Sequence, residues 1–341
     1  MKNMSLELRI LFGFQNKINA PTYPGGNYSG IQVAGHNKTE NTSTGAQIGG
    51  VNTAENSRGL QLGGLNATNN SRGAQAGGVN GAYNSKGVQA GLGNYANTNV
   101  GVQAGGISYA ENSSTGVQAG LVDIVRVNNY GAQIGGVNVV SDRNKGLQVG
   151  TIGNYAEHNT GAQIGGLVNI AKHGNKGLQA GGVNVGVDES NGVQASAFNW
   201  AKKARGFYAG AVNWVCETMY GLQAGLIINR AGDEMRGAQI GTVNYADKSK
   251  GLQAGGVNIT WNEKAEGVQA GALVNSVHEL RGVQAGTTNW AWDKCYGVQI
   301  GLINYAKDGT FLQLGALNFR KPCAGHPAAL CFSPIIGWRR S

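Results

Sequence analysis

The chain of 341 residues has few prolines, few charged residues and no long apolar run. It contains 5 prolines against 58 glycines, and 13% of its residues are charged. Collagen and disordered Pro/Gly-rich chains are both excluded, because each needs far more proline. No stretch approaches the roughly 18 apolar residues of a membrane helix, so we expect no membrane-spanning segment. The short apolar segment 8–14 lacks a clear cleavage site after it, so the sequence predicts no clear signal peptide.

One short unit recurs along almost the whole chain. Nineteen glutamines, from Gln32 to Gln313, stand 14 to 16 residues apart, and Tyr208 fills the one gap in the series. Of these 20 copies, 19 have a glycine two residues before the marker and 18 have a glycine two residues after it. An asparagine follows five or six residues after the marker in 18 copies, and Ser108 and Asp123 replace it in the other two. The unit is Gly-φ-Gln-φ-Gly-x-φ-Asn, where φ is apolar, followed by a polar loop.

The period selects the architecture. Helical-pair repeats need about 33 residues and propeller blades about 40, so 15 residues hold two short strands and two turns. The sequence therefore predicts an all-β fold, a two-sheet β-solenoid of about 20 coils with terminal caps. Stacking at roughly 4.8 Å gives a rod of roughly 95 Å. We expect an N-terminal cap with a degenerate coil in residues 1–29, the solenoid in residues 30–319 and a C-terminal cap in residues 320–341.

The repeated residue types each have a structural role. Glycine allows tight corners or close backbone approach. Stacked amides form ladders of hydrogen bonds from coil to coil. Both residues that flank the glutamine are apolar in every copy, so period-2 alternation predicts that they face the core and that the glutamine lies on a flat outer sheet. The predicted ladder residues include Gln47, Gln61, Gln75, Asn52, Asn66 and Asn80.

Catalytic chemistry is not indicated. An active site is one constellation of residues, whereas the glutamines are nineteen equivalent positions, and the 18 acidic residues are scattered through loops without a paired-carboxylate cluster. We expect no enzymatic activity and no cofactor.

Four cysteines leave a few alternatives open. Cys216 and Cys295 lie about five coils apart, roughly 24 Å at the interstrand spacing, and so are single thiols. Cys323, His326 and Cys331 form a weak candidate metal site, because a fourth ligand is missing and the spacing matches no standard zinc motif. A local disulfide and two plain thiols are the alternatives there.

Charge and aromatic residues suggest two surface stripes. Lys or Arg precedes the first glycine in nine coils, and Arg58, Arg72 and Lys86 form a possible anion-binding edge, since acidic residues interrupt the row in the second half. Nucleic acid is an unlikely partner. An aromatic residue directly follows the asparagine in several coils, and we expect those rings to be buried or half-buried. Trp261 and Trp292 lie outside that slot and are possible exposed aromatics.

The units "GAQIGGVN", "GVQAGGIS" and "GVQIGLIN" resemble those of poorly characterised bacterial surface-repeat proteins with tandem Gly-x-Gln-x-Gly-x-x-Asn units. The resemblance implies a cell-surface or secreted location and no enzymatic activity. We expect a non-enzymatic structural or interaction protein that binds a glycan or a protein, or that self-associates end to end. The alternatives are a carbohydrate-binding or carbohydrate-processing solenoid, an ice-binding β-roll and an anion or nucleic-acid binder along the basic edge.

Overall fold

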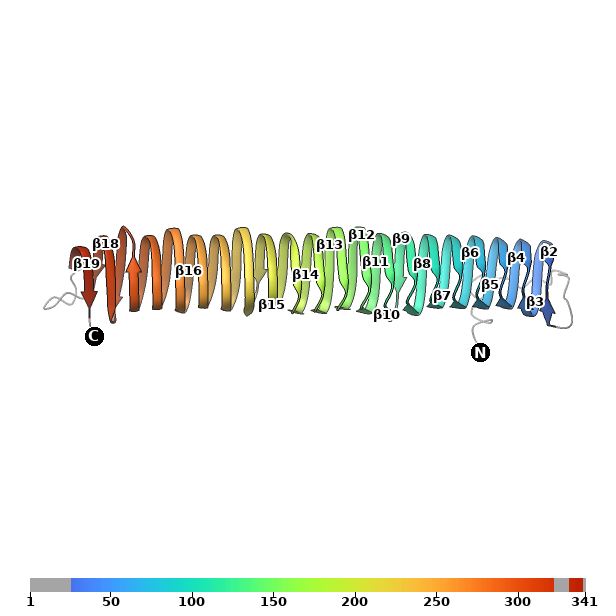
Figure 1. The fold of residues 1–341 in the computed structure, drawn as a ribbon, viewed down its shortest axis with the longest axis horizontal. Helices are drawn as coiled ribbons and strands as arrows, with labels where there is room; N and C mark the ends of the chain where they lie inside the picture. Colours follow the sequence, from blue (N-terminus) through green and yellow to red (C-terminus); the bar gives the residue numbers. More distant parts are fainter. Residues whose placement is uncertain (1–25, 322–330, 340–341) are drawn as a thin grey trace. The chain divides into compact units, whose positions relative to one another are not determined.

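The computed structural model describes residues 26–321 and 331–339, and throughout that part of the chain the regular elements are β-strands (Figure 1). No helix there is long and apolar enough to cross a membrane. The chain separates into two compact units, residues 1–125 (unit 1) and 126–341 (unit 2). The predicted fold class is confirmed: the chain is an all-β solenoid of about 20 turns with repeats of about 15 residues.

Each strand of unit 1 holds most of one coil. The short strands at the start of the unit are followed by strands of 9 to 13 residues from β4 onwards. The strands are β1 (Asn27–Tyr28), β2 (Ile31–Val33), β3 (His36–Ser43), β4 (Ala46–Ser57), β5 (Leu60–Ser71), β6 (Ala74–Ser85), β7 (Val88–Asn99), β8 (Val102–Ser114) and β9 (Val117–Val125).

Unit 2 continues the same pattern with longer strands. Its strand β16 is 82 residues long and runs through several coils without a break, because the corners there keep strand hydrogen bonding. The strands are β10 (Asn128–Asn129), β11 (Ala132–Asn144), β12 (Leu147–Asn159), β13 (Ala162–Asn175), β14 (Leu178–Ser190), β15 (Val193–Val215), β16 (Met219–Ile300), β17 (Ile303–Asp308), β18 (Phe311–Arg320) and β19 (Cys331–Arg339).

Successive coils pair in parallel and place like residues side by side. Gln61 of β5 lies opposite Gln47 of β4 and Gln75 of β6, and the glycines and asparagines of these coils are matched in the same way. Where a coil gains a residue the register shifts in the loop, as between Ala96 and Thr98, and the marker glutamines stay aligned. Elsewhere the shift lies between the second glycine and the asparagine, as between Gly135 and Val137, so length variation is absorbed without moving the glutamines out of register.

The interior is lined mainly by amide and hydroxyl groups, which corrects the prediction that the glutamines lie on an outer sheet. Gln47, Gln61 and Gln75 are fully buried, whereas their apolar neighbours Ile48 and Leu60 are exposed. Alternation shows that neighbouring residues face opposite sides but not which side is inside. Burying an amide is tolerated here because stacking gives each one hydrogen-bond partners. The expected apolar interior is replaced by a polar one.

Close backbone contact explains the second glycine of the unit. A Cβ built on Gly63 would overlap the carbonyl oxygen of Gly49 in the preceding coil and lie 2.7 Å from Nδ2 of Asn52. The first glycine is equally crowded, and in later coils such as that of Gly251 it also has a φ of 128°. Only glycine fits where adjacent coils approach this closely.

The last coil is covered by a strand that runs the other way. β19 pairs antiparallel with β18, so that Trp338 lies opposite Leu312 and Ile336 opposite Leu314. The carbonyl and amide groups on that edge of β18 therefore have partners within the chain. The predicted cap boundaries at residues 29 and 320 stay predictions, and most of the predicted N-terminal cap lies outside the described residues.

Candidate functional site

The buried glutamines form a ladder along each unit. In unit 1, Nε2 of Gln61 donates to Oε1 of Gln47 at 2.7 Å, and equivalent bonds of 2.7 to 2.9 Å link all markers from Gln32 to Gln118. The second N–H of several of these amides donates within its own coil, as from Gln89 to the carbonyl oxygen of Tyr95 at 3.2 Å. Apart from Nε2 of Gln32 at the first coil, the amides of this ladder in unit 1 thereby have hydrogen-bond partners in the buried interior.

The asparagines form a second ladder of opposite direction. Nδ2 of Asn52 donates forward to Oδ1 of Asn66 at 2.8 Å and also to the carbonyl oxygen of Leu62 at 2.9 Å. In unit 2 this ladder is unbroken over thirteen asparagines, from Asn138 to Asn318. Because the glutamine ladder donates backward, the two rows of amide dipoles oppose each other within each coil.

Tyr208 interrupts the glutamine ladder of unit 2. Its phenol is buried and donates to the carbonyl oxygen of Ser190 at 2.9 Å, and burial raises the pKa of the phenol far above its usual value. Around it lies an apolar cluster that includes Met219 and Met235, which replace the serine and asparagine of earlier coils. The interior thus changes from polar to partly apolar within unit 2.

A third amide row was not anticipated from the sequence. Four residues before the marker, Nδ2 of Asn144 donates to Oδ1 of Asn159 and Asn159 to Asn175, at 2.9 and 2.8 Å. In unit 1 the same slot holds buried Ser57, Ser71 and Ser85. The signal was present, because serine or asparagine recurs at this fixed distance from the glutamine.

The outer surface of the glutamine strand is an apolar face, defined as the two residues that flank the marker in each coil. Ile134, Ile164, Ile240 and Ile300 of unit 2 are 43 to 48% exposed in these slots. No charged residue occurs there in any copy. Monomeric proteins rarely expose apolar patches larger than a few hundred Å². The apolar face is therefore a candidate interaction surface.

The aromatic residues that follow the asparagine are half-buried and stack from coil to coil. The rings of Tyr95 and Tyr109 lie 5.6 Å apart and nearly parallel. Arg230 occupies the same slot between two aromatic coils, with its guanidinium 4.3 Å from the ring centre of Trp214 and 5.7 Å from that of Tyr245. These contacts use ring faces that a ligand would otherwise contact.

The two tryptophans outside that slot are exposed. Trp261 is 61% exposed and Trp292 is 49% exposed. Trp292 stacks on Trp290 with ring centres 5.1 Å apart, and its indole N–H donates to Oγ of Ser276 at 2.9 Å. One face of Trp292 is thus held in place by its own unit.

The loop edge of unit 1 carries a row of cations. Arg58, Arg72 and Lys86 are exposed and occupy the same slot in three successive coils, each directly after a stacked serine. Within the described residues, none of the three lies within 4 Å of a carboxylate. We call these three residues the cation row.

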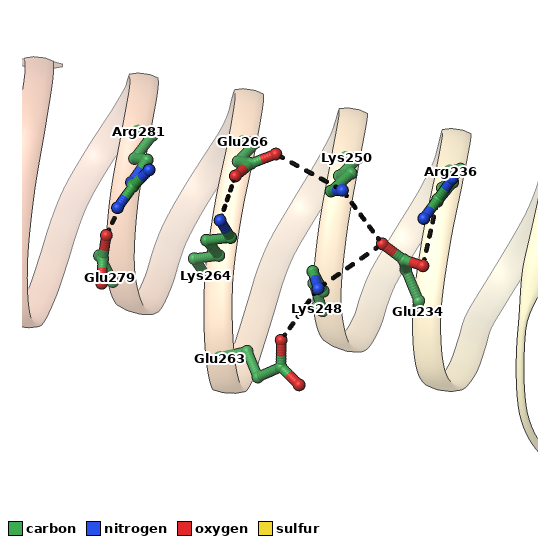
Figure 2. Close-up of polar contacts among 9 residues, drawn as sticks. All are labelled: Glu234, Arg236, Lys248, Lys250, Glu263, Lys264, Glu266, Glu279 and Arg281. Carbon is green, nitrogen blue, oxygen red and sulfur yellow. Dashed lines mark hydrogen bonds and ion pairs between the residues drawn. The ribbon is translucent and has the colours of Figure 1, made fainter.

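The equivalent edge of unit 2 is neutralised by ion pairs (Figure 2). Glu234 contacts Arg236 at 3.0 Å and Lys250 at 3.5 Å, and Lys250 also reaches Glu266 at 3.8 Å. Farther along, Glu279 binds Arg281 at 2.8 Å. The cations in this part of the edge therefore already have anionic partners.

The pKa shifts follow from this network. Burial raises the pKa of the Glu234 carboxyl, but the hydrogen bond and charge of Arg236, with Lys248 and Lys250, outweigh it and hold the pKa below its usual value. The hydrogen bond from Lys264 likewise lowers the pKa of Glu266. Both carboxylates are ionised at neutral pH and act as fixed counter-ions.

Two hollows of unit 2 differ in their lining: one is an apolar groove, and the other is lined by the acidic residues Asp233, Glu234, Asp247 and Glu263 beside Lys248. An open groove of about 1050 Å³ follows the corner formed by Gly210, Gly225, Gly241 and Gly255, and its lining has neither acidic residues nor histidine or cysteine. Ser196 in this groove has its hydroxyl oxygen 2.8 Å from the carbonyl oxygen of Phe198. The groove offers apolar contact but no activated nucleophile.

No group of three metal-binding side chains occurs in the described ranges 26–321 and 331–339. Two members of the predicted metal site, Cys323 and His326, lie outside those ranges, and the side chain of Cys331 is not described, so that site stays a hypothesis. Cys216 is half-buried and Cys295 is buried, and both are free thiols.

Comparison with known protein families, curated proteins and solved structures finds no match for this chain. The resemblance to bacterial surface-repeat proteins therefore stays a hypothesis that rests on the repeat unit alone.

Proposed function

We propose that this chain is a non-enzymatic structural protein that assembles with a second copy of itself through the apolar face. One observation carries the proposal: the residues flanking the marker glutamine are apolar in all twenty coils, and in the structure they face outward. A surface with no role in association would carry charged or polar residues in at least some of these slots.

The size of the apolar face supports association. Unit 2 alone contains thirteen marker positions, from Gln133 to Gln313. At roughly 4.8 Å per coil and about 10 Å of strand width, its face covers about 600 Å². That value is at the upper end of patches exposed by monomers. Exposed leucines at the adjoining corner, such as Leu226 at 78%, extend it toward the roughly 800 Å² per partner of a stable complex.

Period matching favours a second copy over an unrelated partner. Side-chain rows on the apolar face repeat at the spacing of the coils. Another stacked sheet with the same spacing meets every row in the same way, as in the dry interfaces between paired sheets of cross-β structures. An irregular partner surface would match a few rows and leave the rest exposed.

Sedimentation analysis with charged variants tests the proposal. Ile164→Lys with Ile240→Lys places two charges on the apolar face, while Val100→Lys with Val187→Lys adds the same charge at exposed sites elsewhere. We expect dimers or larger assemblies for the parent chain and the control pair, and monomers for the face pair. A parent chain that is monomeric at its solubility limit would contradict the proposal, as would equal behaviour of the two pairs.

A location at the cell surface or outside the cell forms part of the proposal. Its support is the resemblance of the repeat unit to bacterial surface-repeat proteins. Protease treatment of intact cells of the source organism tests it, since a displayed chain is cleaved and an internal one is not. A secreted chain is instead recovered from the medium.

A further inference from the structure

We propose that the cation row of Arg58, Arg72 and Lys86 binds a linear anionic polysaccharide, a ligand independent of the self-association proposed above. The three cations lie in coils of 14 residues that stack without a register shift. Neighbouring cations are therefore about 4.8 Å apart along the coil axis, and the first and third are about 10 Å apart.

Few acidic residues surround the cation row, and Glu55, in the loop of Arg58, forms no ion pair with it within the described residues. From residue 56 to residue 110 the sequence contains these three cations and no Asp or Glu. Three like charges at this spacing repel one another, so an external anion lowers the energy of the folded unit. Elsewhere in the same slot, Lys145 and Arg205 lie over tyrosine rings, while Arg236, Lys250 and Arg281 have carboxylate partners.

A row of amides beside the cations adds hydrogen-bonding capacity. Two residues before each cation stand Asn56, Asn70 and Asn84, all half-buried. Nδ2 of Asn70 donates to Asn56 at 2.8 Å, and Nδ2 of Asn84 donates to Asn70 at 2.9 Å. Each of these nitrogens has a second N–H with no acceptor in the described part of the chain, and so can donate to a ligand oxygen.

The combination fits a chain of acidic sugars. Such a chain presents carboxylates or sulfates at intervals of one or two sugar rings, together with hydroxyls that pair with amides. The length of one sugar ring along an extended polysaccharide is close to the spacing between neighbouring coils, roughly 4.8 Å. The cations contact the charged groups, and the asparagine amides contact the hydroxyls and ring substituents between them.

Nucleic acid fits this edge less well. Binding of single strands relies on aromatic platforms for the bases. Tyr83 is the exposed aromatic residue beside the cation row, whereas Tyr95 and Tyr109 stack on each other. Phosphates on one strand of a duplex follow each other at about 3.4 Å, which is out of step with the coils.

The ion pairs of unit 2 suggest a second variant that tests the role of charge in the cation row. In unit 2, Glu234 stands two residues before Arg236 in the slot that holds Asn70 before Arg72, and it neutralises the neighbouring cations. The variant Asn70→Glu places the same carboxylate inside the cation row without removing a cation. It therefore tests charge compensation separately from the loss of cationic side chains.

The test is fluorescence anisotropy of the full chain with a labelled octamer of galacturonic acid at low salt. We expect binding that weakens with salt, a loss of at least tenfold in affinity for the triple variant Arg58→Gln, Arg72→Gln, Lys86→Gln, and a similar loss for Asn70→Glu. The charge-matched triple variant Arg236→Gln, Lys250→Gln, Arg281→Gln changes the affinity less than twofold. Circular dichroism and thermal melts verify that each variant is folded.

Three results would overturn the inference. The first is no binding by the parent chain. The second is an equal loss in both triple variants, which assigns the attraction to net charge. The third is oligodeoxythymidylate of the same charge competing as strongly as the galacturonate octamer, which assigns the row to nucleic acid.

Discussion

Nε2 of Gln61 lies 2.7 Å from Oε1 of Gln47, one coil earlier and inside the solenoid. From Gln47 to Gln103 each marker glutamine donates in the same direction, so one amide serves both as acceptor for the next coil and as donor to the previous one. A buried amide is costly alone but stable in such a row. The ladder explains why the sequence repeats glutamine and not a generic polar residue, because both a donor and an acceptor are required at that site.

Replacing Gln61 with glutamate tests this requirement. The carboxylate cannot donate to Gln47, and it is buried, so we expect a loss of about 2–4 kcal/mol in the free energy of unfolding at pH 7. Burial raises the pKa of the new carboxyl in the folded state above its unfolded value of about 4.3. The variant is therefore closest to the parent at low pH and loses stability as the pH rises through the folded-state pKa.

Urea unfolding at pH 4 and pH 7 measures this difference. The variant Gln61→Met is the control, since it removes the hydrogen bonds without adding a titratable group. Relative to the parent chain, its cost stays constant between the two pH values. A cost for Gln61→Glu that does not depend on pH would show that the side chain at this position is solvated.

A second prediction concerns the crowded glycines. The variant Gly63→Ala forces a methyl group against the carbonyl oxygen of Gly49, and we expect a loss of about 1–3 kcal/mol. The variant Gly81→Ala, one coil along, is the matched control, because the nearest atom to its Cβ is the carbonyl oxygen of Asn66 at 3.9 Å. Thermal melts compare the two. Equal melting temperatures would contradict the close approach of coils at Gly63.

The sequence was sufficient to predict the stacked coils but not which face of each strand points into the interior. The 14- to 16-residue spacing and the in-register glycines and asparagines predict the stacked coils, since these follow from chain length and backbone geometry alone. The general tendency of apolar residues to be buried then placed Ile48 and Leu60 inside and Gln47 and Gln61 outside, which is wrong. That tendency describes single side chains, whereas a stacked row satisfies the hydrogen bonds of each buried amide.

The cation row was predictable from the sequence, whereas the ion pairs of unit 2 were not. The slot of Arg58, Arg72 and Lys86 was readable because equivalent positions in successive coils must align. The ion pairs of Glu234 and Glu279 with their neighbouring cations depend on loop conformation, which the repeat does not specify. The amide row of Asn56, Asn70 and Asn84 has the same 14-residue spacing as the cations, so its alignment was predictable but was overlooked.

The two free thiols of the described ranges differ in reactivity. Cys295 is buried, and burial raises the pKa of its thiol to about 12, so almost no reactive thiolate is present at pH 8. Cys216 is half-buried. We expect iodoacetamide to modify Cys216 at pH 8 while Cys295 reacts only after denaturation. Peptide mapping by mass spectrometry measures both, and equal labelling of the native protein would contradict the packing around Cys295.

We predict that strand β19 protects the end of unit 2, because it pairs with the edge of β18. In the full chain, Leu312 and Leu314 of β18 lie opposite Trp338 and Ile336 of β19. Deleting residues 331–341 removes β19 and leaves this edge of β18 unpaired. Unpaired edges recruit further strands, so we expect a concentration-dependent increase in light scattering for the truncated chain. Removal of residues 340–341 alone serves as the control. A truncated chain that scatters light and melts like the full chain would show that β19 has no protective role.

Hydrogen exchange of the glutamine side chains tests the inward-facing ladder most directly. The chain contains 20 glutamines, and all but Gln15 are markers of the repeat. Selective labelling of glutamine side-chain nitrogen with ¹⁵N therefore reports almost entirely on the ladder. After transfer of the native protein to D₂O, we expect nearly all of these NH₂ signals to persist, because exchange requires local opening of the coils. Loss of most signals within the first spectrum would place the glutamines on the solvent-facing side and contradict the account.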